Sequence, residues 1–244
     1  MVPFNNYDAT LKSEETVVRN ITREELPVLE LRDVSVKRKR FRLHNINMCL
    51  LPGYIYAIAG ENGSGKTTLL QSILSEKRKH TGRILFYGQD IGNNHAKIMN
   101  EIGFVSEDNI FFEERSARQN AAILGLLYDK FDQELFETYM KQLEAPMGVA
   151  YGRMSRGERI RFQVAFAAAH HSRLLLLDEA TAGIDPVFRI EFFDVLRHLL
   201  VEGATVLMTS HNMTEIARQT DYVAFMKDGV LGEFKESLEV LTGV

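Results

Sequence analysis

The stretch that decides the fold is Gly60-Glu61-Asn62-Gly63-Ser64-Gly65-Lys66-Thr67, a complete G-x-x-x-x-G-K-T motif. An apolar run at 54–59 precedes it, and an apolar, helix-compatible run at 68–74 follows it. This order predicts a strand, a phosphate-binding loop and a helix. A glycine-rich turn with a chance lysine would not need both flanking elements, so we expect a nucleoside triphosphate site here.

The residue types in the motif match the chemistry of a bound triphosphate. Glycines let successive backbone N–H groups point at one anion, and the helix dipole adds partial positive charge. Lys66 can reach the β- and γ-phosphates, while the Thr67 hydroxyl can bind Mg²⁺. The nucleotide contacts expected from this segment are Gly60, Asn62, Gly63, Ser64, Gly65, Lys66, Thr67 and Thr68.

The composition is that of an ordinary globular protein, with 244 residues, 45% hydrophobic and 25% charged. A net charge of -4 argues against a surface that coats nucleic acid, so no nucleic-acid partner is expected. The single cysteine, Cys49, excludes an intrachain disulfide and suits a reducing, cytoplasmic compartment. Because no apolar run approaches the ~20 residues that span a bilayer, we expect any membrane role to come through a partner.

Alternating and fully apolar runs predict an α/β fold. Residues 1–27 are polar and are expected to form an N-terminal extension with one short helix around 13–26. The alternating runs at 28–36 and 41–51 predict an antiparallel β layer lying against the main sheet. We expect the nucleotide-binding domain to cover 28–244, with an inserted α-helical subdomain at about 108–158.

The second half of the chain alternates strands and helices. Together with the first motif, this alternation predicts a mostly parallel central sheet with the phosphate site at its carboxyl edge. Helical spacing marks 117–128 and 133–143 inside the insertion, and a long helix is expected at 159–171. The later runs predict a strand at 174–177, a helix at 187–202, a strand at 204–209 and a hairpin of 223–226 with 230–234.

Two acids follow the apolar strand at 174–177. A parallel central strand is buried on both faces, so Asp178 and Glu179 should emerge at its carboxyl end, beside the phosphate loop. Asp178 can hold the Mg²⁺ shell, and Glu179 can polarise the attacking water as a general base. A strand that merely ends in solvated acids is the competing interpretation, and the upstream loop makes it the weaker one.

Two further features are weak on their own. Ser155 is a suitable N-cap and Gly157 permits close backbone approach, which predicts a second anion site at a helix N-terminus. His211 follows the apolar strand at 204–209, where a lone histidine is more often structural than catalytic.

Taken together, the ordered motifs resemble those of ATP-binding cassette (ABC) ATPases. The order is the phosphate loop, a serine-glycine signature, Leu-Leu-Asp-Glu, Ala182-Gly183-Ile184-Asp185 and a late histidine, over about residues 28–235. The resemblance implies two nucleotide-binding domains that sandwich two ATP molecules head to tail. Ser155 and Gly157 would then contact the γ-phosphate held by the opposite protomer's Lys66. The resemblance also implies that Asp185 belongs to the loop that couples the two sites and that His211 is a switch that contacts the γ-phosphate.

The sequence departs from the family pattern at two functional positions. Glu107 falls where the family usually has glutamine, and it could either bind the metal more strongly or repel the triphosphate. Arg156 replaces a glycine in the signature 154–158, so its charge would lie near the expected γ-phosphate or its side chain would point away. The sequence alone decides neither question.

In the family that the chain resembles, an aromatic residue from the first antiparallel strands normally stacks on adenine. This sequence has none at the best-aligned position, near Arg38. Phe41 is the nearest candidate, and Arg38 or Arg40 could stack by the guanidinium plane instead. The basic run 37–42 could also touch acidic lipids or nucleic acid, but a solvated strand edge protected by charge is the favoured interpretation.

These departures, with a chain that ends soon after the last hairpin, resemble bacterial ATPases that serve ABC-2-type exporters of peptides or antimicrobial compounds. The resemblance implies a homodimer or a paired ATPase, integral membrane permease subunits docked on the helical insertion, and a peripheral location on the inner face of the cell membrane. The rival hypotheses are a non-transport ABC ATPase acting on ribosomes or DNA, and a P-loop kinase that would leave the signature helix and His211 without a role.

Overall fold

A computed structural model of the chain describes residues 22–38, 41–75, 80–107 and 111–242. Most of the expected N-terminal extension, Arg40 and the start of the helical insertion at 108 lie outside these residues. Of the helix expected around 13–26, the described part holds one 3-10 turn, η1 (Arg23–Glu25). None of the helices in the described ranges combines the length and apolarity needed to cross a membrane.

The main sheet has the strand order β10-β9-β3-β8-β7-β6, and neighbouring strands from β9 to β6 run parallel. β10 and β11 pair with β9 in the antiparallel direction. The prediction of a mostly parallel sheet is therefore confirmed. Its strands are β3 (Ile55–Ala59), β6 (Ile102–Val105), β7 (Leu174–Leu177), β8 (Thr205–Ser210), β9 (Tyr222–Lys227), β10 (Val230–Leu231) and β11 (Lys235–Glu236).

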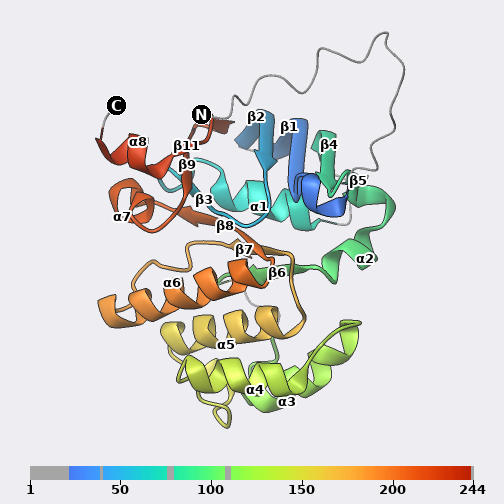
Figure 1. The fold of residues 1–244 in the computed structure, drawn as a ribbon, viewed down its shortest axis with the longest axis vertical. Coiled ribbons are helices and arrows are strands. Elements are labelled where there is room, and N and C mark those ends of the chain that lie inside the picture. The colour runs from blue at the N-terminus through green and yellow to red at the C-terminus, as the bar shows by residue number, and fades with distance from the viewer. Residues whose placement is uncertain (1–21, 39–40, 76–79, 108–110, 243–244) are drawn as a thin grey trace.

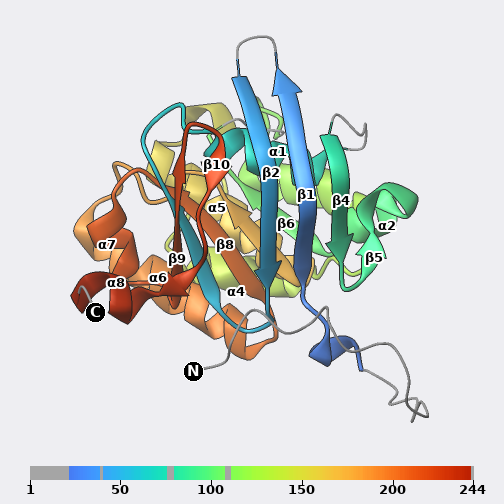
Figure 2. The same cartoon turned by 90° about the horizontal axis from the view of Figure 1, so that it is seen from above.

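A second, antiparallel sheet has the order β2-β1-β4-β5 (Figure 2). Its strands are β1 (Leu29–Arg38), β2 (Phe41–Leu50), β4 (His80–Phe86) and β5 (Gln89–Asp90). The long β1–β2 pair confirms the predicted antiparallel layer, and β4 and β5 enlarge it.

The helices divide between the two sides of the main sheet. α1 lies between the two sheets, α5 and α6 cover the opposite face, and α3 and α4 stack beyond α5 (Figure 1). The helix bounds are α1 (Lys66–Leu74), α2 (His95–Met99), α3 (Ala117–Leu124), α4 (Gln133–Gln142), α5 (Arg156–Ala169), α6 (Pro186–Val201), α7 (Met213–Ala217) and α8 (Ser237–Thr242), with 3-10 turns η2 (Ile91–Asn93), η3 (Gly125–Leu127) and η4 (Tyr151–Arg153).

The central strands are apolar throughout because each of their two faces packs into a different hydrophobic core. In β3, Ile55 and Ala57 face the core shared with α5 and α6, while Tyr56 and Ile58 face the core shared with α1 and the antiparallel sheet. Successive side chains of a strand point to opposite faces, so a strand covered on both faces must be apolar throughout. This double burial fixes where the strand ends, and hence where the site begins.

Two predicted boundaries were wrong. The signature helix runs over Arg156–Ala169 and not 159–171, because Ser155 caps it and His171 adopts a positive φ of 56° just beyond its end. The second hairpin strand is only Val230–Leu231, because residues 232–234 stand opposite only two residues of β9 and the regular pairing resumes at β11.

Candidate nucleotide site

The phosphate loop leaves β3 at Ala59 and enters α1 at Lys66, as predicted. Gly65 is the N-cap of α1 with a φ of 116°, and a Cβ there would lie 2.6 Å from the Cζ atom of Phe41. A Cβ on Gly60 would lie 2.3 Å from the carbonyl oxygen of Met226. Gly63, with a φ of 84°, faces open space, because a Cβ there would meet no atom within 4 Å. The glycines therefore permit both the turn and its close packing, and they leave one side of the loop accessible.

The loop is fixed by hydrogen bonds from three directions. The Ser64 N–H donates to the Glu61 carbonyl at 3.1 Å, and the Gly229 N–H donates to the Ser64 carbonyl at 2.9 Å. The Gly60 N–H donates to the carbonyl of Ser210 at 3.1 Å. The hydroxyl oxygen of Ser64 is buried and makes no hydrogen bond with the described residues. A buried polar atom without a partner, inside a cradle of this type, fits a bound phosphate.

Lys66 is buried at the centre of the site, with 5% of its side chain exposed. Its Nζ donates to the carbonyl oxygens of Gly60 at 2.7 Å and Glu61 at 3.2 Å. The same Nζ lies 3.0 Å from Oε1 of Glu179. The structure therefore joins the predicted phosphate-binding lysine to the predicted general base.

Glu179 has a left-handed backbone conformation, with a φ of 50°, and both its backbone and its carboxylate contact other residues. Its N–H donates to the Thr209 hydroxyl at 3.0 Å, and that hydroxyl donates to Oδ1 of Asp178 at 2.7 Å. Nδ1 of His211 lies 2.9 Å from Oε2 of Glu179, so His211 joins the site although its sequence position alone was weak.

Sequence reasoning missed Thr209. β7 and β8 are parallel, and the register pairs Leu177 with Met208, so the residues that follow these two lie side by side. A hydroxyl at the end of one strand could therefore have been matched to the acids at the end of the next, once the two strands were known to be neighbours.

The electrostatics of Glu179 favour the ionised carboxylate. Burial alone would raise its pKa, but hydrogen bonds and charge from His211 and Lys66 outweigh burial and hold the pKa below its ordinary value. A carboxylate that stays ionised at neutral pH can accept a proton from water, as a general base must.

The signature segment caps α5. The Ser155 hydroxyl accepts from the Glu158 N–H at 3.3 Å, and the Glu158 carboxylate accepts from the Ser155 N–H at 2.7 Å. Gly157 has open space where a Cβ would stand. The predicted N-cap is thus confirmed, and the first turn of the helix faces outward at Gly157.

Arg156 turns toward its own chain. Its Nε lies 2.7 Å from Oε1 of Glu107, and its Nη2 donates to the carbonyl oxygen of Glu179 at 3.0 Å. The two departures from the family pattern therefore contact each other, which sequence reasoning did not anticipate.

Asp185 and Phe41 also have local structural contacts. Asp185 caps α6 through its Oδ1, which accepts from the Phe188 N–H at 2.9 Å. The half-buried Phe41 ring packs against Gly65 in the phosphate loop. Arg38 is exposed and pairs in register with Phe41 at the end of the β1–β2 ladder.

The oxygen donors suit a hard cation. Asp178 is buried, with 9% exposed, at the end of β7, while Thr67 is exposed in the first turn of α1. Glu107 is exposed but already ion-paired with Arg156. Within the described ranges, no group of three or more His, Cys, Asp and Glu side chains is arranged to hold a metal. Mg²⁺ commonly binds one or two protein oxygens together with substrate phosphates, so the residues present fit that mode.

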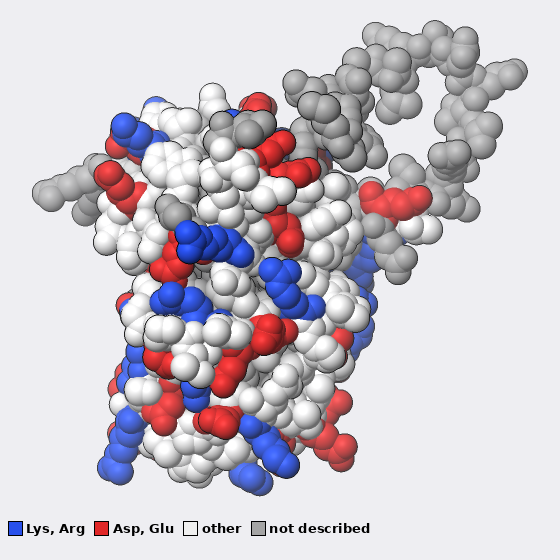
Figure 3. Space-filling model, turned by 60° about the vertical axis from the view of Figure 1, so that its left-hand side comes forward, with Lys and Arg blue, Asp and Glu red and all other residues white. Residues whose placement is uncertain are grey.

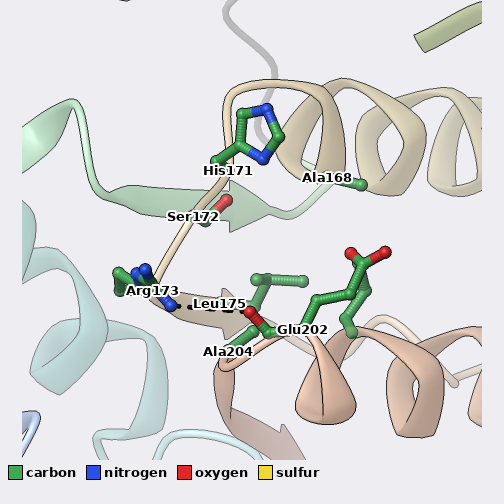
Figure 4. A pocket seen from close by; sticks show the side chains of 8 residues that line it. Ala168, His171, Ser172, Arg173, Leu175, Glu202 and Ala204 are labelled. Atoms are coloured by element: carbon green, nitrogen blue, oxygen red, sulfur yellow. Dashed lines mark hydrogen bonds between the residues drawn. The ribbon is translucent and has the colours of Figure 1, made fainter. Parts of the chain in front are cut away.

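A small cavity lies away from this site. It has a volume of about 70 Å³, and its lining includes His171, Arg173 and Ala204, which precede β7 and β8 (Figure 4). Across its mouth the Arg173 Nη1 donates to the carbonyl of Glu202 at 3.5 Å. This cavity is at the amino edge of the main sheet, whereas Lys66 and Glu179 stand at the carboxyl edge.

The site combines a glycine-rich loop between β3 and α1, a buried lysine at the start of α1 and two acids at the end of β7. These features define a P-loop nucleotide-binding domain of the α/β class. The ABC transporter family model matches residues 43–182, more than half of the 244 residues. The chain belongs to the ABC transporter family and is an ATP-binding domain of it, as the motif order predicted.

Two ATP-binding proteins of bacterial ABC transporters are similar to this chain in sequence. The chain is 32% identical over 190 residues to the ABC transporter ATP-binding protein YtrB of Bacillus subtilis, covering 78% of this chain and 65% of that protein. It is 31% identical over 194 residues to the bacitracin transport ATP-binding protein BcrA of Bacillus licheniformis, covering 78% of this chain and 63% of BcrA. The matched part therefore spans just under two thirds of these relatives.

The fold is also that of a solved ABC protein. The structure of cbiO1 from Clostridium perfringens, part of the ABC transporter complex cbiONQ, superposes with a TM-score of 0.76 at 26% identity, covering 89% of this chain and 92% of that chain.

Proposed function

We propose that this chain, as a nucleotide-binding domain over 28–244, hydrolyses ATP to drive an exporter of peptides or antimicrobial compounds. The observation that carries the ATPase proposal is the contact of Lys66 with Glu179 and of Glu179 with His211 at the carboxyl edge of the sheet. The export proposal has narrower support. Relatives include the bacitracin protein BcrA and the lantibiotic transport protein SrtF of Streptococcus pyogenes, but also a ribose import protein.

Each residue of the phosphate loop and its neighbours would have its own role in binding or hydrolysing ATP. The loop amides, Lys66 and Thr68 would bind the phosphates, with Phe41 against the base. Thr67 and Asp178 would hold Mg²⁺, which neutralises charge on the β- and γ-phosphates, while Glu107 is ion-paired with Arg156. Glu179, kept ionised by Lys66 and His211, would orient and deprotonate the attacking water. His211, half exposed beside Glu179, would contact the γ-phosphate.

Completion of the site would require a second ATPase domain, either another copy of this chain or a paired one. Ser155 and Gly157 stand at the exposed start of α5, where they could reach a γ-phosphate bound across a dimer. Asp185 would link the two sites through the start of α6. Permease subunits would dock on the helical insertion around α3 and α4, which places the chain on the inner face of the membrane.

The test of nucleotide binding is Lys66→Ala, compared with Lys130→Ala as a control at an exposed turn. ATP affinity, measured by calorimetry, should fall beyond detection in the first variant and stay within two-fold in the second. Unchanged affinity in Lys66→Ala would refute the phosphate-loop assignment.

The test of transport is co-purification of the tagged chain from membranes. Recovery with a hydrophobic multi-helix protein supports a transporter, whereas recovery with ribosomes or DNA would support the rival non-transport ATPase. On the part of the surface in Figure 3 that the structure describes, Lys and Arg are interspersed with Asp and Glu, which gives little support to a nucleic-acid partner.

A further inference from the structure

Arg156 is a cation in a position that its helix does not favour. It is the first residue of α5, and positive charge in the first turn opposes the helix dipole. Its Nε is buried and has no hydrogen bond of good angle, so its 2.7 Å contact with Oε1 of Glu107 is an ion pair. The reason for an arginine here therefore lies in its tertiary contacts.

One of these contacts is with the backbone of Glu179. The Nη2 of Arg156 donates to the Glu179 carbonyl at 3.0 Å, and the Ala182 N–H donates to the same oxygen at 3.1 Å. A non-glycine residue with a φ of 50° is held there only by its surroundings, since that conformation costs on the order of 1–3 kcal/mol. Arg156 supplies one of the bonds that keep this turn in place.

We propose that Arg156 is a positioning residue for Glu179 and that Glu107 orients Arg156. The inference rests on the proposed function, because it gives the proposed general base its geometry. Charge compensation also answers the question that Glu107 raised: its carboxylate is paired within the chain and does not face the triphosphate as an uncompensated charge. Since Arg156 lies between Ser155 and Gly157, it links the segment facing a partner's ATP to the base of its own site.

The test combines hydrolysis with nucleotide binding. Arg156→Met should lower kcat by about 10- to 100-fold, the scale of effect that a small misplacement of a reacting group produces. ATP affinity should change less than two-fold, because the polar partners of Arg156, Glu107 and Glu179, lie outside the phosphate loop. Arg156→Lys, which keeps the charge but not the planar fork, should recover part of kcat. A kcat within two-fold of the parent in Arg156→Met, or an equal loss of ATP affinity, overturns the proposal.

The role of Glu107 is tested by a double-mutant cycle. Glu107→Gln should lower kcat about 3-fold, as expected for a partly exposed ion pair, and should have no further effect in Arg156→Met. The same factor in both backgrounds would mean that Glu107 acts independently, for example on the metal. A matched control is the pair Arg32 and Glu30, 2.7 Å apart on β1, where Arg32→Met should leave kcat unchanged.

Hydrogen exchange separates this proposal from the proposed function. In the chain without nucleotide, Arg156→Met should speed exchange at the Ala182 amide by about 10-fold or more, while the Ser64 amide in the phosphate loop stays unchanged. This result would hold even if the protein hydrolysed no ATP. Unchanged exchange at Ala182 in both Arg156 variants would refute the positioning role on its own.

Discussion

The two edges of the main sheet differ in what they hold. At the carboxyl edge, charged side chains from distant segments contact one another, with Lys66, Glu179 and His211 within 3.0 Å of a partner. At the amino edge lie the hollows: the cavity beside Arg173 and a wider groove beside Tyr54 and Tyr222. The difference shows that neither of these two hollows lies at the proposed active site.

Parallel strands explain the contrast. Every parallel strand delivers its following loop to the same edge, so the phosphate loop, the acids after β7 and His211 after β8 gather there. The predicted phosphate site is the loop between β3 and α1, where Lys66 contacts Glu179 from the end of β7. The amino edge receives helix ends and short connections, and its charged residues Arg173 and Glu202 meet only through a long hydrogen bond to a backbone carbonyl.

The largest expected effect is at the carboxyl edge. Glu179→Gln should lower hydrolysis by ~10²–10⁴-fold as the loss of a general base, and an ATP-bound dimer should persist. Phosphate release and size-exclusion chromatography with ATP measure the two effects. Glu202→Gln at the amino edge is the control and should stay within two-fold. Normal turnover in Glu179→Gln would contradict the proposal that the carboxyl edge, and not the amino edge, carries hydrolysis.

The next effect is a pH dependence of stability from the amino edge. His170 precedes β7, stacks on Tyr128 and contacts the Asn100 carbonyl at 3.2 Å; burial lowers its pKa to about 4. The unfolded chain takes up this proton near pH 6.5 and the folded chain only near 4, so stability is lost as pH falls between these values. The loss attributable to His170 should approach ~3 kcal/mol.

Urea unfolding at pH 7 and pH 4.5 checks this loss. His170→Phe should show a smaller drop between the two values, because the remaining drop comes from carboxylates such as Glu179. Equal drops in the parent and the variant would contradict the assignment to His170.

A third effect separates stability from activity within one strand, β8. Thr209→Val leaves Oδ1 of Asp178 and the N–H of Glu179 without their hydroxyl partner, which should cost about 1–3 kcal/mol of stability and lower hydrolysis by about 10-fold. Thr205→Val at the other end of β8 removes a hydroxyl that accepts from Gly53 N–H at 3.0 Å. It should cost similar stability but leave hydrolysis within two-fold. Similar hydrolysis rates in the two variants would show that Thr209 has no special role.

The smallest effect is at the cavity itself. Arg173→Met removes an exposed, long hydrogen bond to Glu202, so the free energy of unfolding should change by no more than about 0.5 kcal/mol. Hydrolysis should stay unchanged. A loss of activity here would mean that the amino-edge cavity belongs to the functional site after all.

Most of the fold was predictable because its determinants are local or periodic. Alternation identified β1 and β2, and continuous apolar runs identified β3, β7 and β8, because burial on one or both faces dictates those patterns. The errors came at ends: the signature helix begins at Arg156, directly after the Ser155 cap, and β10 ends at Leu231, where the pairing with β9 is interrupted before it resumes at β11. The Ser155 cap was predicted from the sequence, whereas the interruption of the pairing along β9 is visible only after folding.

The sequence by itself determined the phosphate loop and the two acids after β7, because each is a contiguous motif whose chemistry follows from neighbouring residues. Only the tertiary structure decided that Thr209 bridges Asp178 and Glu179, that Phe41 packs on Gly65, and that Arg156 turns to Glu107 and Glu179. These contacts join segments far apart in the chain. The direction of a long, charged side chain depends on which opposite charges and free carbonyls the folded neighbours present.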